Sequence, residues 1–560
     1  MAVNLHNLRG KIAAAALVKG AAWNLSRLPR GRRTITATAN RLHPQDAGEV
    51  TGSYRGLLAQ LLRDVLPDDG TEVIYDPIAG LLSGTVTPTA DLSALENSAL
   101  ENSARTHPGA GSLIALAAAY RKPYVGRYED ALHTYERAFA HNPADLRSVE
   151  GIINCGARTT FDWPRIWIAV ETLLPSRGTF ATETARQILA GLFSAHPDQR
   201  QLAQAIELIT EQDSQQQDSQ LQDQHQLLLE ALSVRLQFLG QFAVGARVRE
   251  HMARNRISEL RGIPLESPLW LKHLLGAHVL LGQYQQAQRR AAAPRLTSRD
   301  PKTRVQLAKL RADVALVTGH PEPLQEHILQ RAQQMPLPGE QRMRELAAGR
   351  RVAVVGPADT GDKLGDLIDS YDLVVRTRYQ PEFVAQHREV MGTRTDIAYY
   401  SGRDLHAMLD EVNSAAEAGA LQMVVARPFS APLIAERPSW LRFARTEFGL
   451  YFRGAPLATQ RILYDLLQFA PAEIALFNVD FFTGSTPYAA DYRDRSSSFG
   501  PYSPMNDVVM VHDLLTEFRH TKAFQRTGLI TAHGAAGQVL ALTDEQYLQL
   551  LEAQSPLPQR

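Results

Sequence analysis

Two patterns of apolar and polar residues divide the chain. From about residue 60 to 335, apolar residues recur at helical spacing among Leu, Ala, Gln, Glu and Arg, which are good helix formers. After about residue 340, short continuous apolar runs alternate with helical patterns. Short apolar runs are typical of buried strands, and their alternation with helices predicts a doubly wound α/β domain with a parallel sheet.

The α/β part contains five predicted strands and one prominent helix. The helix is TQRILYDLLQFA at 459–470. The predicted strands are VAVVG (352–356), LVVRT (373–377), IAYY (397–400), MVVARP (423–428) and IALFNV (474–479).

One segment of the helical part has a specific pattern. In GRYEDALHTYERAFAHNP (126–143), Ala131, Tyr135, Ala138 and Phe139 fall on one helical face. Gly-x-Tyr, the small residues on that face and the closing Asn-Pro resemble the second helix of a tetratricopeptide repeat (TPR), with a weaker echo in LGQYQQA (281–287). Single repeats cannot bury their own faces, so a degenerate repeat array is predicted over about 105–335. An irregular helical bundle is the alternative.

The sequence is therefore interpreted as three parts. Residues 1–50 form a basic extension, 51–335 a helical, TPR-like repeat region, and 340–550 an α/β domain. The boundary is placed in QQMPLPGEQRMRELAAGRR, where two prolines and a glycine precede a short helix.

Composition and charge limit the classes of protein. Of the 560 residues, 44% are hydrophobic and 21% charged, and the 59 basic and 59 acidic residues balance, which gives no indication of nucleic-acid binding. The single cysteine, Cys155, excludes a disulfide framework and a cysteine-built zinc site, and fits a reducing, cytoplasmic location. No apolar run is long enough to span a membrane.

The first 44 residues contain eight Lys or Arg and no acid. Three interpretations stay open for this extension: a transit peptide, a solvated tail, or an amphipathic helix at the surface of an anionic membrane, with residues 1–45 as the contact at the inner membrane face.

Candidate chemistry lies at the carboxyl ends of the predicted strands, where open α/β sheets bind ligands. Gly356 follows the first strand, and a glycine there lets the backbone approach a ligand. Arg376 and Arg378 end the second, where guanidinium groups can bind phosphate or carboxylate. His512 follows an apolar run, and Glu517 lies five residues on. Neither the dinucleotide nor the P-loop glycine pattern is present.

These pieces, in this order, resemble the sialyltransferase family. Its large motif is matched by VAVVG, KLGDLIDSYD and LVVR, its following Gly-x-Lys/Arg-Thr segment by MGTRTDI (391–397), its small motif by PLATQRILYDLLQFAPAEIALFNVDFF, and its His-x4-Glu motif by HDLLTE. The match covers about 340–530. The matching residues of the large motif are Gly356, Leu364, Gly365, Ile368, Asp369, Ser370, Asp372 and Arg376.

The resemblance implies a helical repeat (TPR-like) region joined to a C-terminal α/β, Rossmann-like domain of sialyltransferase type, a variant of the GT-A fold. It implies an inverting, metal-independent glycosyltransferase that moves a sugar acid from a CMP donor to a glycan or lipid-linked glycan. His512 would be the general base, and Glu517 would orient the backbone or the histidine. The donor-binding residues would be Gly356, Pro357, Asp359, Arg376, Arg378, Thr459 and Asp480.

Departures from the family pattern leave the donor open. Pro357 and Arg378 stand where the family has asparagine, and Thr459 or Gln460 replaces the glycine of the small motif. An extra arginine suits an anionic ulosonic acid, so sialic acid, Kdo and Kdn are all retained as donors, in bacterial capsule or other surface polysaccharide synthesis. The repeat region is expected to bind the acceptor, a protein or another copy of itself. The alternative function is a non-catalytic repeat scaffold with a degenerate nucleotide-binding domain.

Overall fold

The protein is described by a computed structural model over residues 109–554, except for 123–124, 214–221, 261–267, 294–300, 401–402, 435–437, 487 and 493–503. The basic extension 1–50 and its predicted membrane contact lie outside the described residues. In the part that is described, no helix is both long and apolar enough to cross a membrane.

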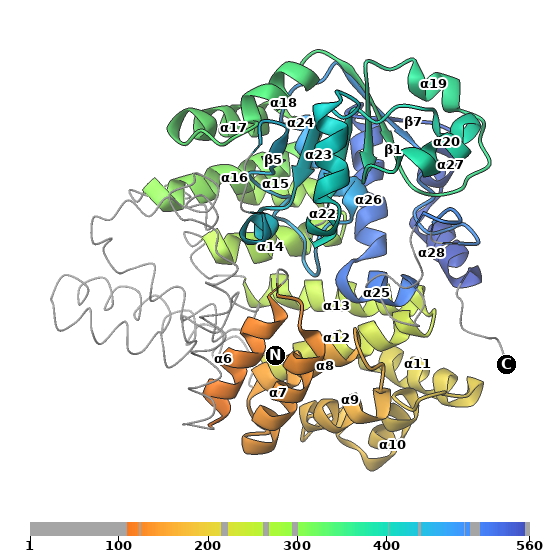
Figure 1. The fold of residues 1–560 in the computed structure, drawn as a ribbon. Helices are drawn as coiled ribbons and strands as arrows, with labels where there is room; N and C mark the ends of the chain where they lie inside the picture. Colours follow the sequence, from red (N-terminus) through yellow and green to blue (C-terminus); the bar gives the residue numbers. More distant parts are fainter. Residues whose placement is uncertain are drawn as a thin grey trace, which may run out of the picture.

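The described residues before 350 form helices and no strand (Figure 1). These helices are α6 (Ala110–Arg121), α7 (Tyr128–His141), α8 (Leu146–Gly156), α9 (Trp163–Val170), α10 (Glu183–Leu192), α11 (Gln199–Asp213), α12 (Gln222–Phe238), α13 (Phe242–Glu259), α14 (Pro268–Leu280), α15 (Tyr284–Ala291), α16 (Pro301–Val317), α17 (Glu322–Gln334) and α18 (Glu340–Ala347).

The helical face predicted in α7 is confirmed. Ala131, Tyr135 and Ala138 are buried, and Phe139 is half-buried. Gly151 of α8 lies so close to the ring of Tyr135 that an added Cβ would be 2.4 Å from it. Small residues thus allow the close approach of neighbouring helices that the pattern indicated.

The same type of turn connects the helices of two helical hairpins. Gly240 between α12 and α13, and Gly282 between α14 and α15, have φ of 73° and 66°. In each, the glutamine after the glycine donates its N–H to the carbonyl five residues earlier, at 2.8 Å. This is the helix-ending motif that requires a left-handed residue, which explains the glycine. Each glutamine precedes an aromatic residue, so Gly-x-aromatic marks both turns.

The second half contains a seven-stranded parallel sheet with the order β5-β4-β3-β2-β1-β6-β7. The strands are β1 (Arg351–Val355), β2 (Leu373–Thr377), β3 (Ile397–Tyr400), β4 (Met423–Ala426), β5 (Leu441–Phe443), β6 (Glu473–Phe477) and β7 (Thr531–Ala532). The five predicted strands are confirmed, and β5 and β7 are additional.

Helices cover both faces of the sheet (Figure 1). The helices of this half are α19 (Gly365–Asp369), α20 (Pro381–Gln386), α21 (Arg388–Met391), α22 (Arg403–Ala407), α23 (Leu409–Glu417), α24 (Ala458–Leu467), α25 (Pro504–Val511), α26 (Leu514–Arg526), α27 (Ala535–Ala541) and α28 (Asp544–Ala553). Alternate residues of the strands enter different cores: Val354 and Val375 pack with α16, α17, α24 and α26, while Ala353 and Val374 pack with α19.

The boundary predicted between 335 and 340 does not separate two cores. Residues of α13–α18 share one hydrophobic cluster with the strands and with α24–α28. A buried hydrogen bond also crosses the boundary, since Arg445, which forms an ion pair with Glu340 at 2.5 and 2.7 Å, donates to the carbonyl of Met335 at 2.6 Å. The helices from α6 to α12, with part of α13 and Met510 of α25, form a second large core.

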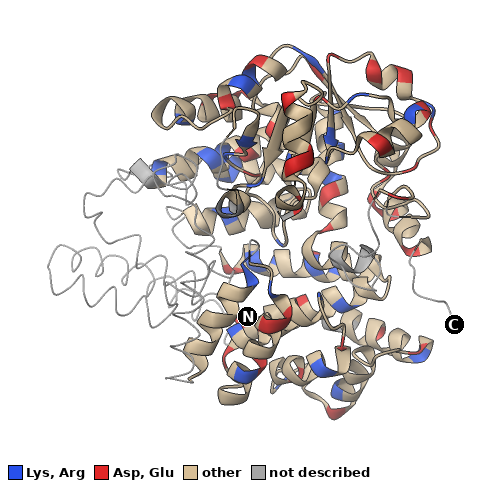
Figure 2. Ribbon diagram, in the orientation of Figure 1, with Lys and Arg blue, Asp and Glu red and all other residues tan. Residues whose placement is uncertain are grey.

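Basic and acidic residues are interspersed along the described helices and loops of both halves (Figure 2). The charge balance of the sequence is therefore also found locally along the described chain.

Candidate active site

A cavity of about 590 Å³ lies at the carboxyl ends of the strands. The strand order reverses between β1 and β6, because the chain runs outward from β1 to β5 and returns beside β1. Open parallel sheets bind ligands at such a reversal. Residues after β1, β2, β4 and β6 line this cavity, together with the start of α24 and the turn between α25 and α26.

The backbone around the cavity has several left-handed residues. Arg378 has φ of 69°, Asn478 of 51°, Phe481 of 52° and Phe482 of 64°, and all four line the cavity. Each costs conformational free energy for a non-glycine residue, and such residues concentrate at functional sites.

His512 lies on the cavity wall in a defined tautomer. Its Nδ1 is 2.6 Å from the carbonyl oxygen of Ala455, which can only accept, so Nδ1 carries the proton and Nε2 keeps its lone pair. Burial lowers the pKa of His512 to about 3; the bond to Ala455 opposes this, and the cations Arg461, Arg427 and Arg158 add to it. The imidazole is therefore neutral at physiological pH and able to accept a proton.

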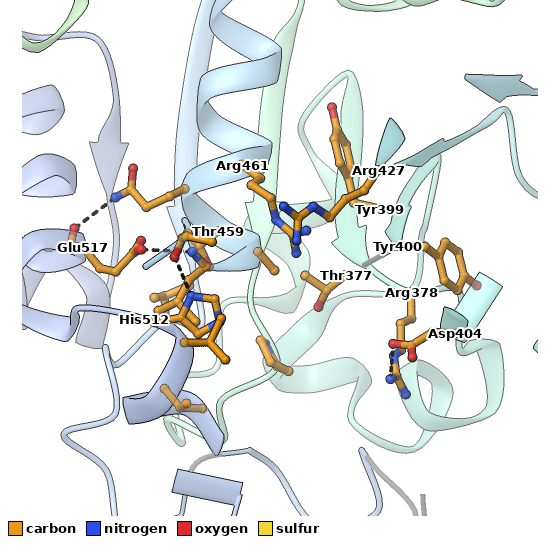
Figure 3. A pocket seen from close by; sticks show the side chains of 18 of the residues that line it. Thr377, Arg378, Tyr399, Tyr400, Asp404, Arg427, Thr459, Arg461, His512 and Glu517 are labelled. Atoms are coloured by element: carbon orange, nitrogen blue, oxygen red, sulfur yellow. Dashed lines mark hydrogen bonds and ion pairs between the residues drawn. The ribbon is translucent and has the colours of Figure 1, made fainter. Parts of the chain in front are cut away.

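Glu517 also lines the cavity, but its contacts are with the protein. Its Oε1 accepts from the hydroxyl of Tyr451 and from the N–H of Leu457, both at 2.9 Å; Glu517 itself is labelled in Figure 3. Burial raises the pKa of Glu517 to about 8, so the carboxyl is largely protonated at neutral pH. Its bond to Leu457 fixes the residue before α24, so Glu517 holds this stretch of backbone in place beside the cavity.

Two arginines in the cavity are neutralised by acids. Arg427, directly after β4, makes a bidentate pair with Glu447 at 2.7 and 2.8 Å. Arg378, after β2, pairs with Asp404 (Figure 3). Arg378 thus faces the cavity as predicted, but an acid partly satisfies it.

Arg461 differs from these two. It belongs to the first turn of α24 and its guanidinium group lies beside that of Arg427 (Figure 3). Its Nε and Nη1 are buried without a hydrogen-bond partner, and no carboxylate of the described residues forms an ion pair with it. Burial, with the charge of Arg427 as a smaller cause, lowers its pKa to about 10. A cation whose buried donors have no partner is a candidate for binding an anion.

The start of α24 provides backbone donors at the same place. Thr459 is its second residue and lines the cavity, as do Ala458 and Gln460. The residue before the helix, Leu457, provides no side-chain cap. The first N–H groups of a helix favour negative charge, so the predicted placement of Thr459 beside an anionic ligand has a physical basis.

Pro357 and Asp480 lie in the cavity wall as well. The carbonyl of Pro357 accepts from the N–H of Ala489 at 2.9 Å. The carboxylate of Asp480 accepts from the N–H groups of Phe482 and Gly484 at 3.0 and 3.1 Å, and its pKa is raised by burial. Asp480 thereby shapes the loop that carries the two left-handed phenylalanines.

Three predicted donor-binding residues do not line the cavity. Gly356 packs on β6, where an added Cβ would lie 2.4 Å from the carbonyl oxygen of Asn478. Asp359 is exposed and accepts from the N–H of Gly361 at 3.3 Å. Arg376 is buried and donates to the carbonyls of Met391 and Arg394. These three residues therefore contact the protein and do not face the cavity.

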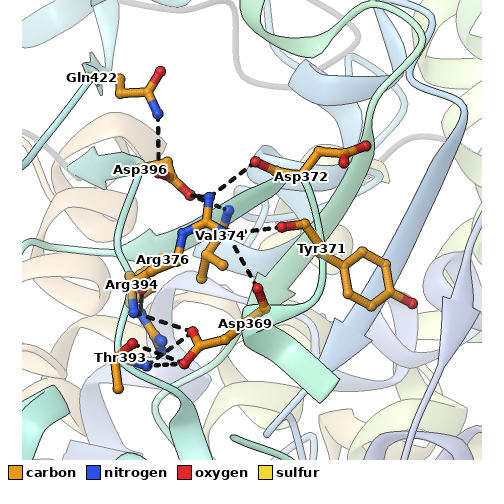
Figure 4. A network of polar contacts seen from close by, with 9 residues as sticks. All are labelled: Asp369, Tyr371, Asp372, Val374, Arg376, Thr393, Arg394, Asp396 and Gln422. Atoms are coloured by element: carbon orange, nitrogen blue, oxygen red, sulfur yellow. Dashed lines mark hydrogen bonds and ion pairs between the residues drawn. The ribbon is translucent and has the colours of Figure 1, made fainter. Parts of the chain in front are cut away.

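The large-motif residues form one polar network (Figure 4). Asp369 accepts from the N–H and hydroxyl of Thr393 at 2.8–3.0 Å. Arg394 donates to the carbonyls of Tyr371 and Asp372, at 2.9 and 3.0 Å, and to Asp396 at 2.8 Å. Ile-Asp-Ser-Tyr-Asp and Met-Gly-Thr-Arg-Thr therefore bind each other and hold β2 and β3 in place.

The helical half contributes to the site in two ways. Arg249 of α13 forms a fully buried ion pair with Asp513, 3.0 Å long, and Asp513 caps α26 beside His512. Although burial alone would raise it, the pKa of Asp513 is held below its usual value by Arg249 and the N–H of Thr516. In addition, Tyr128 and Arg158 line the cavity itself.

Sequence reasoning missed Arg427, Arg461 and the pair Tyr128–Arg158. Arg427 lies near the end of the predicted strand 423–428 and directly after β4 as observed, so attention to the carboxyl ends of the strands would have found it. Arg461 lies inside the segment matched to the small motif, where a charged residue in an apolar helix was the available signal. No local signal connects Tyr128 or Arg158 with His512.

No group of three or more His, Cys, Asp or Glu in the described ranges is arranged to hold a metal ion. No protein-family model matches the chain, and no curated protein matches it.

Proposed function

We propose that the protein is an inverting glycosyltransferase that uses a CMP-activated 2-keto-3-deoxy sugar acid and transfers the sugar to a glycan hydroxyl. The observation that carries the proposal is one cavity containing a neutral histidine and a buried arginine without a counterion, His512 and Arg461. One group can accept a proton, and the other requires an anion.

In this reaction the acceptor hydroxyl attacks the anomeric carbon. A bond forms between the acceptor oxygen and C2, the bond from C2 to the phosphate oxygen breaks, and CMP leaves with the electron pair. Nε2 of His512 takes the hydroxyl proton. The tautomer set by Ala455 supports this role, since it leaves Nε2 unprotonated.

The leaving phosphate and the sugar carboxylate both need positive charge. Arg461 and Arg427, with the N–H groups at the start of α24, offer it in a site partly closed to water, where such donors are strongest. Arg378, paired with Asp404, can supply further donors. Sialic acid, Kdo and Kdn all carry the carboxylate that this site suits.

The Rossmann-like and TPR-like assignments belong to the same proposal. The strand order and the helices on both faces support the former, and the Gly-x-aromatic hairpin turns support the latter. The resemblance to sialyltransferases places the reaction in synthesis of a bacterial surface polysaccharide, on a glycan or lipid-linked acceptor at the cytoplasmic side of the membrane.

Thermal unfolding with nucleotides tests the donor class. CMP and CMP-sugar acids are expected to stabilise the folded protein, by about 2.7 kcal/mol at one hundred times Kd, whereas NAD leaves the melting temperature unchanged. If no cytidine nucleotide raised the melting temperature, the proposal would be contradicted.

The role of His512 is tested by His512→Ala. We expect the rate of transfer from CMP-Kdo, CMP-sialic acid or CMP-Kdn to fall by a factor of about 10²–10⁴, the usual contribution of a general base. Mass spectrometry of the products measures the transfer. CMP affinity should stay unchanged. Undiminished turnover in the variant would exclude His512 as the base.

A further inference from the structure

One carboxyl oxygen of Glu517 has no partner in the protein. Its Oε1 accepts hydrogen bonds from the hydroxyl of Tyr451 and the N–H of Leu457. Its Oε2 is buried and has no hydrogen-bond partner among the described residues. Glu517 is only 2% exposed, and it lines the cavity that contains His512. A buried polar atom without a partner costs folding free energy, so Oε2 is a candidate for contact with a ligand.

The two bonds at Oε1 place the carboxyl proton of Glu517 on the other oxygen. Oε1 has two lone pairs, and the donors from Tyr451 and Leu457 occupy both. Burial raises the pKa of Glu517 to about 8, although these two bonds act to lower it. The group is therefore mainly a carboxylic acid at neutral pH, with its O–H at Oε2. This O–H is a donor for which the described residues provide no acceptor.

We propose that Glu517 is a further catalytic residue of the proposed reaction, and that its Oε2–H donates a hydrogen bond to the phosphate of the CMP donor. The inference rests on the proposed function, because that function supplies the phosphate. The hydrogen bond stabilises the negative charge that the phosphate gains as its bond to C2 breaks. Glu517 keeps its proton, so the one proton transferred is still that which passes from the acceptor hydroxyl to His512.

The surroundings of Glu517 favour an anionic oxygen at this place. The carboxyl group binds the N–H of Leu457, directly before α24, and the N–H groups at the start of a helix favour phosphate. Gln460, in the first turn of α24, donates to the backbone carbonyl of Glu517 at 3.0 Å and joins the helix start to α26. The positive charge of Arg461 acts on the carboxyl group as well. Phosphate would thus find helix N–H groups, a guanidinium group and Oε2–H together.

Glu517 is the group here whose charge should change between pH 7 and 9. Burial raises the pKa of the neighbouring tyrosines well above its usual value and lowers that of the neighbouring histidines to about 3. The aspartate stays ionised, since its pair with Arg249 holds its pKa low against burial, and the arginine, with a pKa lowered by burial to about 10, stays mainly charged. These neighbours are Tyr451, Tyr547, His512, His520, Asp513 and Arg461.

Calorimetric titration of CMP into the full-length protein tests the role of Glu517. The phosphate of CMP is already ionised above pH 7. Between pH 7 and 9 we expect the affinity to fall about tenfold, because Glu517 loses its proton and then repels the phosphate. At pH 8, titrations in buffers of different ionisation enthalpy should show uptake of about half a proton per CMP bound. CMP has no sugar carboxylate, so such an effect is assigned to the phosphate.

Two variants separate this role from general effects of charge. Glu517→Gln keeps an N–H donor at the position of Oε2 but cannot ionise, so its CMP affinity should stay constant from pH 7 to 9, without proton uptake. Glu545→Gln removes a carboxylate from an exposed position of α28 and should retain the tenfold change.

The inference would be overturned by constant CMP affinity and no proton uptake in the unmodified protein, a result that requires no variant. The same pH dependence in Glu517→Gln would overturn it as well. Failure of CMP to bind at any pH would instead contradict the proposed function, so the two proposals can fail separately.

Discussion

At the scale of single residues, the most informative group is a cation that folding leaves unsatisfied. Arg461 buries Nε and Nη1 without hydrogen-bond partners, although an arginine on the surface would have all its donors in water. Burial of an unpaired polar group costs folding free energy. The lowered pKa of Arg461 has the same cause, which is loss of solvation. Binding of an anionic ligand to the guanidinium group would recover this free energy.

Replacement of Arg461 should therefore affect the free energy of unfolding and the affinity for the ligand in different ways. We expect Arg461→Met to leave the free energy of unfolding unchanged or to raise it by about 1 kcal/mol, because an unpaired buried charge is removed. The affinity for a CMP-sugar acid should fall by about tenfold or more, since a charge-assisted contact is lost. Denaturant unfolding and calorimetric titration measure the two quantities.

Arg427→Met is the matched control in the same cavity. It removes the partner of Glu447 and should destabilise the protein, because a half-buried carboxylate then loses a bidentate ion pair. If Arg461→Met destabilised the protein as much as Arg427→Met, the assignment of Arg461 as an unsatisfied cation would be wrong.

From the raised pKa of Glu517 we expect the free energy of unfolding to decrease as pH rises. Its pKa in the folded protein is about 8, above the ordinary value of 4.5, so the folded state binds the proton more tightly than the unfolded state. Its contribution to stability is complete below the unfolded pKa and is lost as pH rises toward 8. Glu517→Gln preserves the acceptor for Tyr451 and Leu457 but cannot ionise.

The comparison is made by denaturant unfolding between pH 6.5 and 8, and histidines such as His512, which titrate in the unfolded state near pH 6.5, contribute equally to both proteins and cancel in the difference. The free energy of unfolding of the unmodified protein, relative to Glu517→Gln, should decrease with pH, with a slope of at most about 1.4 kcal/mol per pH unit. A difference that is constant over this range would mean that Glu517 is ionised in the folded state.

At the scale of elements, prediction succeeded where a local pattern was sufficient. The long apolar strands and the α7 face follow from composition and periodicity, whereas β5 and β7, of three and two residues, are too short to carry a pattern. In the site, the direction of each side chain decided whether a predicted residue faces the cavity. Arg376 is still within β2 and points into the packed network, while Arg378 lies beyond the strand with a left-handed φ and faces the cavity.

The turn between α25 and α26 depends on an ion pair from another element. Arg249 of α13 binds Asp513 where neither is exposed, and Asp513 caps the helix that follows His512. We expect Asp513→Asn and Arg249→Met each to cost about 3–5 kcal/mol, as for a buried pair that loses one partner. The double variant should recover part of this, and unfolding of all four proteins measures the coupling.

Additive effects of the two substitutions would contradict a direct pairing of Arg249 with Asp513. A positioning role has its own signature: in the double variant, CMP affinity should be retained while kcat falls, because His512 loses its fixed orientation. Equal losses in CMP affinity and kcat would instead indicate a general loss of structure.

At the scale of the whole molecule, the change in sequence pattern near residue 335 is a change of secondary structure within one shared hydrophobic cluster. Helices α14–α17 place Leu271, Leu275, Leu310, Val314, Leu324 and Ile328 in the cluster that covers one face of the sheet. Burial of such a side chain contributes about 2 kcal/mol. Six of them contribute about 12 kcal/mol, which is comparable with the total stability of a domain, roughly 5–15 kcal/mol.

The α/β part should therefore not fold when it is separated at the predicted boundary. A fragment of residues 340–554 exposes the apolar face that these helices cover, and we expect it to lack a cooperative unfolding transition and to bind no CMP. A fragment of residues 222–554 keeps α12–α28 and should unfold cooperatively, at lower stability than the whole chain, because it loses only the helices of the first core. Circular dichroism during urea unfolding distinguishes these outcomes. A cooperative transition in the shorter fragment would place the folding boundary where the sequence pattern changes and would reduce the helices to an attached module.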